Sequence, residues 1–168
     1  MALLEIVTVP DPILRRKAHK VIDFDNEFHK LVSDMVETMR EAPGVGLAAP
    51  QVGVSLRLVV VEYRDDEEEK LPKKLYVLAN PEVTEKSEEK VLGIEGCLSV
   101  PDLLGEVERY EKVVIKALNR QGKPVKVKAE GWLARVFQHE IDHLEGIVYT
   151  DLTEKIWKPA EDDETPLD

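Results

Sequence analysis

The sequence predicts a single α+β domain in which antiparallel or mixed β-sheets surround one buried helix, with an amphipathic helix nearer the N-terminus. Two segments carry apolar residues at helical spacing, residues 26–40 and 132–144, and the segments between them are rich in β-branched residues. The length of 168 residues fits one domain, and such a domain buries about 70% of its unfolded surface. We place the domain at residues 1–152 and a short acidic tail at 153–168.

The sequence pattern in the N-terminal third of the chain predicts two helices. Residues 11–17 form a short helix after Pro10, and residues 26–40 repeat apolar side chains at i, i+3, i+4 and i+7, which is typical of an amphipathic helix. Pro43 and Gly44 end this helix.

The middle of the chain predicts strands. Residues 56–63 are rich in β-branched side chains, and residues 75–78 lead into a turn at Asn80-Pro81. The segments 107–118 and 125–129 flank the sequence NRQG, which predicts a hairpin.

The segment 132–144 predicts the second long helix, with Gly146 as its C-terminal cap. Its apolar residues surround most of the helix axis, which is typical of a helix buried inside a domain.

The composition excludes several classes of partner. A net charge of −11, from 23 basic and 34 acidic residues, argues against nucleic acid or an anionic membrane as the main partner. The acidic runs at residues 65–69 and 161–164 are expected to be solvated. A single cysteine, Cys97, forms no intrachain disulfide and indicates a reducing compartment. We expect neither a signal peptide nor a membrane span, although a removed organelle leader would be compatible with the sequence.

The sequence QHEIDH at residues 138–143 contains the pattern His-Glu-x-x-His. On a helix, His139 and His143 lie on one face, where both imidazoles can bind one metal ion. Glu140 can then act as a general base on a water molecule that the metal activates.

A catalytic site of this kind needs a third ligand. One protease class has a longer pattern whose third ligand is a histidine, but this chain has Tyr149 at that position. A downstream glutamate is a weaker alternative, because Glu154, Glu161 and Glu164 lie in a short polar segment. Cys97 is the better candidate, because thiolate is a strong ligand for such metals.

Two other features of the sequence are expected to bind neither a metal ion nor a nucleotide. The other histidines, His19 and His29, are expected at the surface. The segment GVGLAAPQ at residues 44–51 imitates a dinucleotide-binding loop, but it follows a helix and contains Pro50, so we expect no nucleotide there.

Three segments in this order, GVGLAAPQ (44–51), EGCLS (95–99) and QHEIDH (138–143), resemble the three signature motifs of the peptide deformylases, and DPILR (11–15) resembles the opening of that family. The resemblance implies a hydrolase that removes the N-formyl group from nascent polypeptides beginning with formylmethionine. The chain differs from some members of that family at Arg135, where they often have an apolar pocket residue, and at Leu104, where they can have an arginine.

The resemblance also implies roles for individual residues. Cys97, His139 and His143 would bind the metal, and Glu140 would be the general base and acid. Gln51 and the backbone N–H of Leu98 would hold the formyl oxygen. The substrate would lie along the following residues: Gly44, Val45, Gly46, Glu95 and Gly96.

For the cofactor, the resemblance implies ferrous iron, with zinc or nickel as occupants of purified protein. For partners, it implies a nascent N-formyl-Met peptide, allows a transient contact with the ribosome, and predicts a cytoplasmic monomer of bacterial type. Two alternatives stay open: a metalloendopeptidase, because His-Glu-x-x-His occurs in many proteases, and a structural metal site closed by four ligands.

Overall fold

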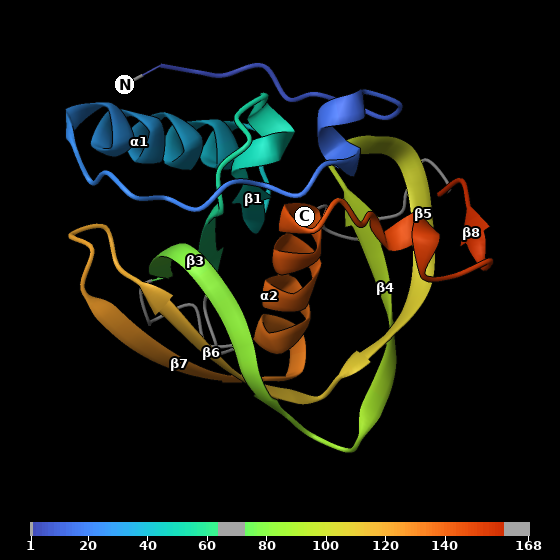
Figure 1. Cartoon of the computed structure of the whole chain (residues 1–168). Helices are drawn as coiled ribbons and strands as arrows, with labels where there is room; N and C mark the ends of the chain where they lie inside the picture. Colours follow the sequence, from blue (N-terminus) through green and yellow to red (C-terminus); the bar gives the residue numbers. More distant parts are fainter. Residues whose placement is uncertain (1, 64–72, 160–168) are drawn as a thin grey trace.

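The computed structural model describes residues 2–63 and 73–159, and the acidic runs at 65–69 and 161–164 lie outside these residues. The helix α2 (Gly131–Leu144) stands at the centre of the molecule, with strands of two sheets around it (Figure 1). The predicted α+β fold with one enclosed helix is confirmed.

The larger sheet has five strands in the order β1-β2-β3-β6-β7, and all neighbours in it are antiparallel. Its strands are β1 (Gly46–Ala48), β2 (Leu58–Tyr63), β3 (Lys74–Lys86), β6 (Lys112–Leu118) and β7 (Pro124–Glu130). The hairpin predicted around residues 119–122 joins β6 to β7. Because β1 ends the order, it is an edge strand of this sheet.

The smaller sheet has three antiparallel strands in the order β4-β5-β8. They are β4 (Lys90–Cys97), β5 (Val100–Tyr110) and β8 (Ile156–Trp157). A tight turn between β4 and β5 contains Leu98 and Ser99. This turn places the end of β4 near the C-terminal half of α2, with Cys97 facing His143.

The helix α1 (Asn26–Glu41) covers the other face of the larger sheet. Its N-terminus is capped by Asp25, whose side chain accepts a hydrogen bond of 3.0 Å from Phe28 N. The described residues also form three short 3₁₀ helices: η1 (Pro12–Arg15), η2 (Ala49–Val52) and η3 (Tyr149–Asp151). In the described part of the chain, neither α-helix is both long and apolar enough to span a bilayer.

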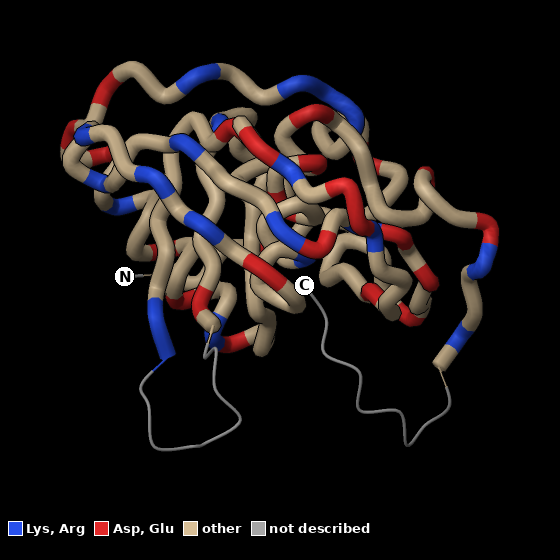
Figure 2. The backbone as a smooth tube through the Cα atoms, turned by 90° about the horizontal axis from the view of Figure 1, so that it is seen from below, with Lys and Arg blue, Asp and Glu red and all other residues tan. Residues whose placement is uncertain are grey.

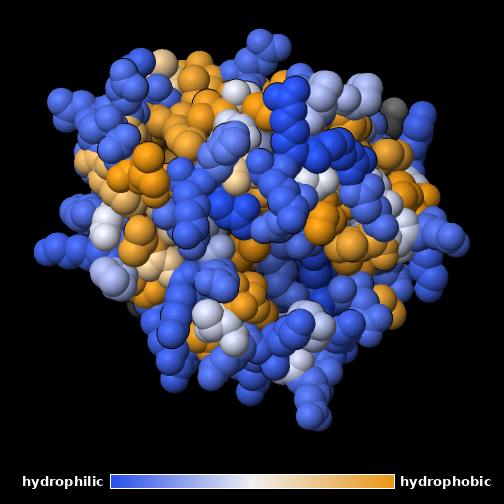
Figure 3. Space-filling model, viewed as in Figure 1, coloured by the Kyte–Doolittle hydropathy of each residue, from blue (hydrophilic) through white to orange (hydrophobic). Residues whose placement is uncertain are grey.

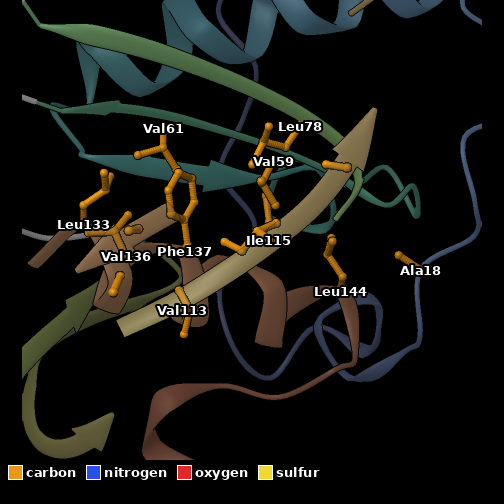
Figure 4. Packing of buried hydrophobic residues seen from close by; sticks show 14 residues of the cluster. Ala18, Val59, Val61, Leu78, Val113, Ile115, Leu133, Val136, Phe137 and Leu144 are labelled. Carbon is orange, nitrogen blue, oxygen red and sulfur yellow. The ribbon is translucent and has the colours of Figure 1, made fainter. Parts of the chain in front are cut away.

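The strand β2 lies between two of the hydrophobic clusters of the core, because alternate residues of a strand point to opposite faces. Val59 and Val61 pack toward Phe137 of α2 (Figure 4). Phe137 also meets Tyr76 edge to face. Leu58 and Val60 pack toward α1. Helix α2 therefore covers one face of the larger sheet, and helix α1 covers the other face.

Charged residues of both signs alternate along the described chain (Figure 2). Hydrophobic side chains lie among hydrophilic ones on the face seen in Figure 3. Basic residues thus lie among the acidic ones along the backbone of the described residues.

Two strand predictions are wrong. The expected turn at Asn80-Pro81 is a bulge inside β3, where Asn80 has φ of +51° and its side chain bonds to both backbone polar atoms of Val21. The expected strand 107–118 is divided at Glu111, since β5 belongs to one sheet and β6 to the other.

The strand β4 was not predicted, because Gly93 and Gly96 are poor strand formers. By contrast, both long helices and the capping role of Gly146, which has φ of +77°, are confirmed.

Candidate metal centre

Cys97, His139 and His143 converge at the centre of the molecule. Cys97 ends β4, while the two histidines lie one turn apart on α2. One ligand atom from each residue lies within 4.8 Å of the other two, and all three side chains are buried. The distance from Cys97 Sγ to His143 Nε2 is 3.4 Å.

This donor set fits a divalent transition metal. One thiolate and two imidazoles suit zinc, iron or a neighbouring metal. A tetrahedral ion with metal–sulfur and metal–nitrogen bonds of about 2.3 and 2.1 Å separates its ligand atoms by roughly 3.5 Å. The separation between Cys97 and His143 is close to this value. Three protein ligands also leave a coordination position for water or substrate.

Glu95 orients the ring of His139. Its Oε1 lies 2.9 Å from His139 Nδ1, so the carboxylate accepts a hydrogen bond from Nδ1 and leaves Nε2 as the metal-binding nitrogen. Burial by itself would raise the pKa of Glu95, but hydrogen bonds from Arg109 and His139 hold this pKa well below its usual range. Glu95 is therefore a buried anion at neutral pH.

The two histidine rings have opposite electrostatic environments. Burial would lower the pKa of His139, but hydrogen bonds to Cys97 and Glu95 outweigh it and raise that pKa. Burial, and next the charge of His139, lower the pKa of His143. The surroundings of His139 thus favour a positive charge, which a metal cation can supply in place of a proton.

Glu140 is fully buried and lies against the edge strand β1. A Cβ atom built on Gly46 would stand 2.7 Å from Glu140 Oε2, so only glycine fits at position 46 with this carboxylate in place. The charge of Glu140 contributes to the raised pKa of His139, so its carboxylate lies near the candidate metal centre.

The amide of Gln51 points toward Cys97. Its Oε1 accepts a hydrogen bond of 2.9 Å from Ala48 N, which fixes the orientation of the side chain. Its Nε2 donates to Ser99 Oγ at 3.1 Å and lies 3.6 Å from Cys97 Sγ. Gln51 is fully buried, so this donor is positioned before any ligand binds.

The remaining predicted residues lie around the same centre. Gly44 and Val45 lead into β1, and Leu98 lies in the turn directly after Cys97. Gly96 precedes Cys97 in β4. Glu95 differs from the expectation of a substrate contact, because both of its oxygens accept hydrogen bonds from protein side chains. This arrangement favours a role in holding His139.

The rejected ligands lie elsewhere. The hydroxyl of Tyr149 donates to Leu103 O at 2.9 Å, and Glu154 and His19 are exposed. His29 is partly exposed on α1. Glu161 and Glu164 lie outside the described residues.

Sequence reasoning noted Arg135 only as a departure from an apolar residue, and it missed Arg109 and the buried ion pairs around Glu95. Arg109 donates to both Glu95 oxygens, at 2.9 and 2.8 Å, and also to Asp142. Arg135 donates to Glu95 Oε2 at 2.7 Å. A further signal was the position of Arg135 one helical turn before His139, which places both on one face of α2.

A family model described as polypeptide deformylase matches residues 3–158. The peptide deformylase of Symbiobacterium thermophilum is 54% identical over 164 residues, covering 98% of this chain and 73% of that protein. The peptide deformylase of Natranaerobius thermophilus is 47% identical over 161 residues, covering 96% of this chain and 99% of that protein.

Solved structures agree with these sequence relatives. A crystal structure of the Ehrlichia chaffeensis peptide deformylase in complex with actinonin has a TM-score of 0.86 and 42% identity, covering 92% of this chain and 91% of that chain. The Legionella pneumophila peptide deformylase has a TM-score of 0.83 and 44% identity, covering 91% and 87%. The chain therefore belongs to the polypeptide deformylase family, the metal-dependent hydrolases that remove the N-formyl group from nascent polypeptides.

Proposed function

We propose that this chain performs its deformylation at a metal ion held by Cys97, His139 and His143, with Glu140 as the general base and acid. The observation that carries this proposal is the convergence of one cysteine and two histidines from separate elements on one buried point. A divalent metal bound there supplies Lewis acidity and lowers the pKa of a water molecule to about 7.

Glu140 takes a proton from the attacking water and delivers it to the amine that leaves. The carboxylate is suited to this task because it is buried beside Gly46 and adjacent in sequence to His139. A positioned acid–base group of this kind contributes roughly 100- to 10,000-fold in rate.

Gln51 Nε2 and the backbone N–H of Leu98 stabilise the negative charge that develops on the formyl oxygen. Both belong to segments next to Cys97, and the Gln51 amide is fixed by its bond from Ala48 N. Loss of one such donor typically costs about 100- to 1000-fold in rate.

The peptide substrate pairs with the edge strand β1 near Gly44, Val45 and Gly46, and passes Gly96 on the opposite side. This role is supported by the sheet order, in which β1 pairs with β2 along one edge. An extended peptide can add to the other edge through backbone hydrogen bonds. For Glu95 we propose the holding of His139 in place of a direct substrate contact.

The native metal is ferrous iron, with zinc or nickel as alternative occupants. The catalytic domain comprises residues 1–152, acts as a monomer in a bacterial cytoplasm and contacts the ribosome transiently. The bacterial origin of the relatives supports this setting, because nascent formylated peptides are made there.

The test is formate release from a formyl-Met peptide by anaerobically iron-loaded protein. We expect formate in proportion to the iron content and none above background from metal-free protein. Digestion of casein without formate release would instead favour the metalloendopeptidase. The use of Cys97 as third ligand argues against that alternative.

A further inference from the structure

The side chain of Arg135 enters the space beside Gly93. A Cβ atom built on Gly93 would lie 2.7 Å from Arg135 Cζ and 2.8 Å from both Nε and Nη2. These distances are shorter than van der Waals contact, so any other residue at position 93 would displace the guanidinium. The absence of a side chain at Gly93 of β4 therefore leaves the space that the Arg135 guanidinium of α2 occupies.

The guanidinium has little freedom to move away. Arg135 Nη2 donates to Val91 O at 2.6 Å, and Nη1 donates to Val107 O at 2.9 Å. These carbonyls belong to β4 and β5, so one side chain from α2 is bonded to both strands. Arg135 is only 5% exposed, which makes these hydrogen bonds costly to lose.

The same guanidinium holds Glu95. Arg135 Nη1 donates to Glu95 Oε2 at 2.7 Å, while Glu95 Oε1 accepts from His139 Nδ1 at 2.9 Å. One face of α2 thus presents both Arg135 and His139 to a single carboxylate, which they contact through its two different oxygens.

Arg109 also binds Glu95, but Glu95 is not its only acidic partner. Arg109 is shared between two acids, because its Nε and Nη2 donate to Glu95 and its Nη1 donates to Asp142. The ion pair of Arg135 is directed to Glu95. Removing Arg135 would take away one of the two arginine donors to Glu95 Oε2 and leave the carboxylate to Arg109, which Asp142 also binds.

We propose that Arg135, in the space left by Gly93, is a positioning residue for deformylation: it fixes the carboxylate of Glu95 and, through it, the ring of His139. This inference rests on the proposed role of His139 as a metal ligand. Partners that orient a metal-binding histidine typically contribute about 10- to 100-fold to metal affinity or activity.

The test compares Arg135→Met, Arg135→Lys and Gly93→Ala with the wild-type protein, each loaded with cobalt(II). The measurements are the visible spectrum, the rate of cobalt loss to a chelator, and kcat and KM for a formyl-Met peptide. Arg40→Met is the matched control, since Arg40 also donates to a carboxylate, that of Glu62, but on an exposed helix face.

We expect Arg135→Met to lose cobalt about 10- to 100-fold faster and to lower kcat by a similar factor, with KM changed little and altered ligand-field bands. Arg135→Lys should restore part of the loss, and Arg40→Met should match the wild type. A folded Arg135→Met protein with wild-type spectrum, cobalt loss and kcat would overturn the inference. If Arg135→Met does not fold, the same criteria apply to Arg135→Lys and Gly93→Ala.

A double-variant cycle tests the pairing of the two residues. Gly93→Ala should be as damaging as Arg135→Met in the wild type, but should change cobalt loss less than about twofold in an Arg135→Ala background, where no guanidinium is present to be displaced. Equal effects in both backgrounds would contradict the pairing.

The wild-type protein separates failure of this inference from failure of the proposed function. A wild-type protein without thiolate-to-cobalt absorption and without formate release would overturn the proposed function as well. An active wild type with unaffected Arg135 and Gly93 variants would overturn only this inference.

Discussion

The carboxylate of Glu140 lies so close to Gly46 that a Cβ atom at position 46 would stand 2.7 Å from its Oε2. The pair joins the central helix α2 to the edge strand β1. A methyl group on this strand would displace the proposed general base from the place where the substrate is expected to bind.

Gly46→Ala should therefore lower kcat by about 100-fold, because a displacement of roughly 1 Å in a catalytic group can have an effect of that size. The metal content should stay normal. Steady-state formate release and metal analysis measure both. Gly53→Ala is the control, since a Cβ there meets nothing within 4 Å. Its φ of +82° should reduce stability without a matching loss of kcat. Wild-type turnover by Gly46→Ala would show that Glu140 need not occupy this position.

Glu140→Ala should keep its metal and lose about 100- to 10,000-fold in kcat, because the group that moves the proton is removed. Metal analysis beside single-turnover kinetics separates the two effects. Near-normal rates in a metal-replete variant would remove the general-base assignment.

Cys97→Ser should change the amount or identity of the bound metal, since a hydroxyl replaces the only thiolate that this chain can offer. Elemental analysis after purification under identical conditions is the measurement. If stoichiometry, metal preference and activity all survive the substitution, Cys97 is not a ligand.

Arg40→Met should lower the free energy of unfolding by about 0.2–1 kcal/mol at pH 7, which is the range for exposed ion pairs. A hydrogen bond from Arg40 lowers the pKa of Glu62 in the folded protein. In the unfolded chain the pKa of glutamate is about 4.3. The stabilisation is thus complete above this value and is lost as the pH falls through the lower folded pKa. Urea unfolding of both proteins at pH 7 and pH 3 tests the sign, and a difference that grows at pH 3 would contradict it.

The sequence was most informative where one element carries its own pattern. The helix of His139 and His143 could be predicted because spacing along one helix decides both its burial and the shared face of the two rings. Cys97 could be proposed because few residue types bind such metals. Fold class and candidate ligands both followed from these local constraints.

The buried charges could not be predicted in the same way. Arg135 donates to Glu95, which is 40 positions away in the sequence, and this contact exists only because β4 packs against α2. Gly93 looks like a strand breaker in the sequence, yet it is the residue that makes room for the guanidinium. Such pairings depend on the packing of distant segments, and local propensity does not record them.

X-ray absorption of the iron-loaded wild-type protein tests the central claim most directly, because it counts the atoms bound to the metal. Coordination by Cys97, His139 and His143 predicts one sulfur neighbour at about 2.3 Å together with nitrogen or oxygen neighbours at about 2.0–2.2 Å. The sulfur contribution should disappear in Cys97→Ser. A first coordination sphere of nitrogen and oxygen alone in the active wild-type enzyme would contradict the account.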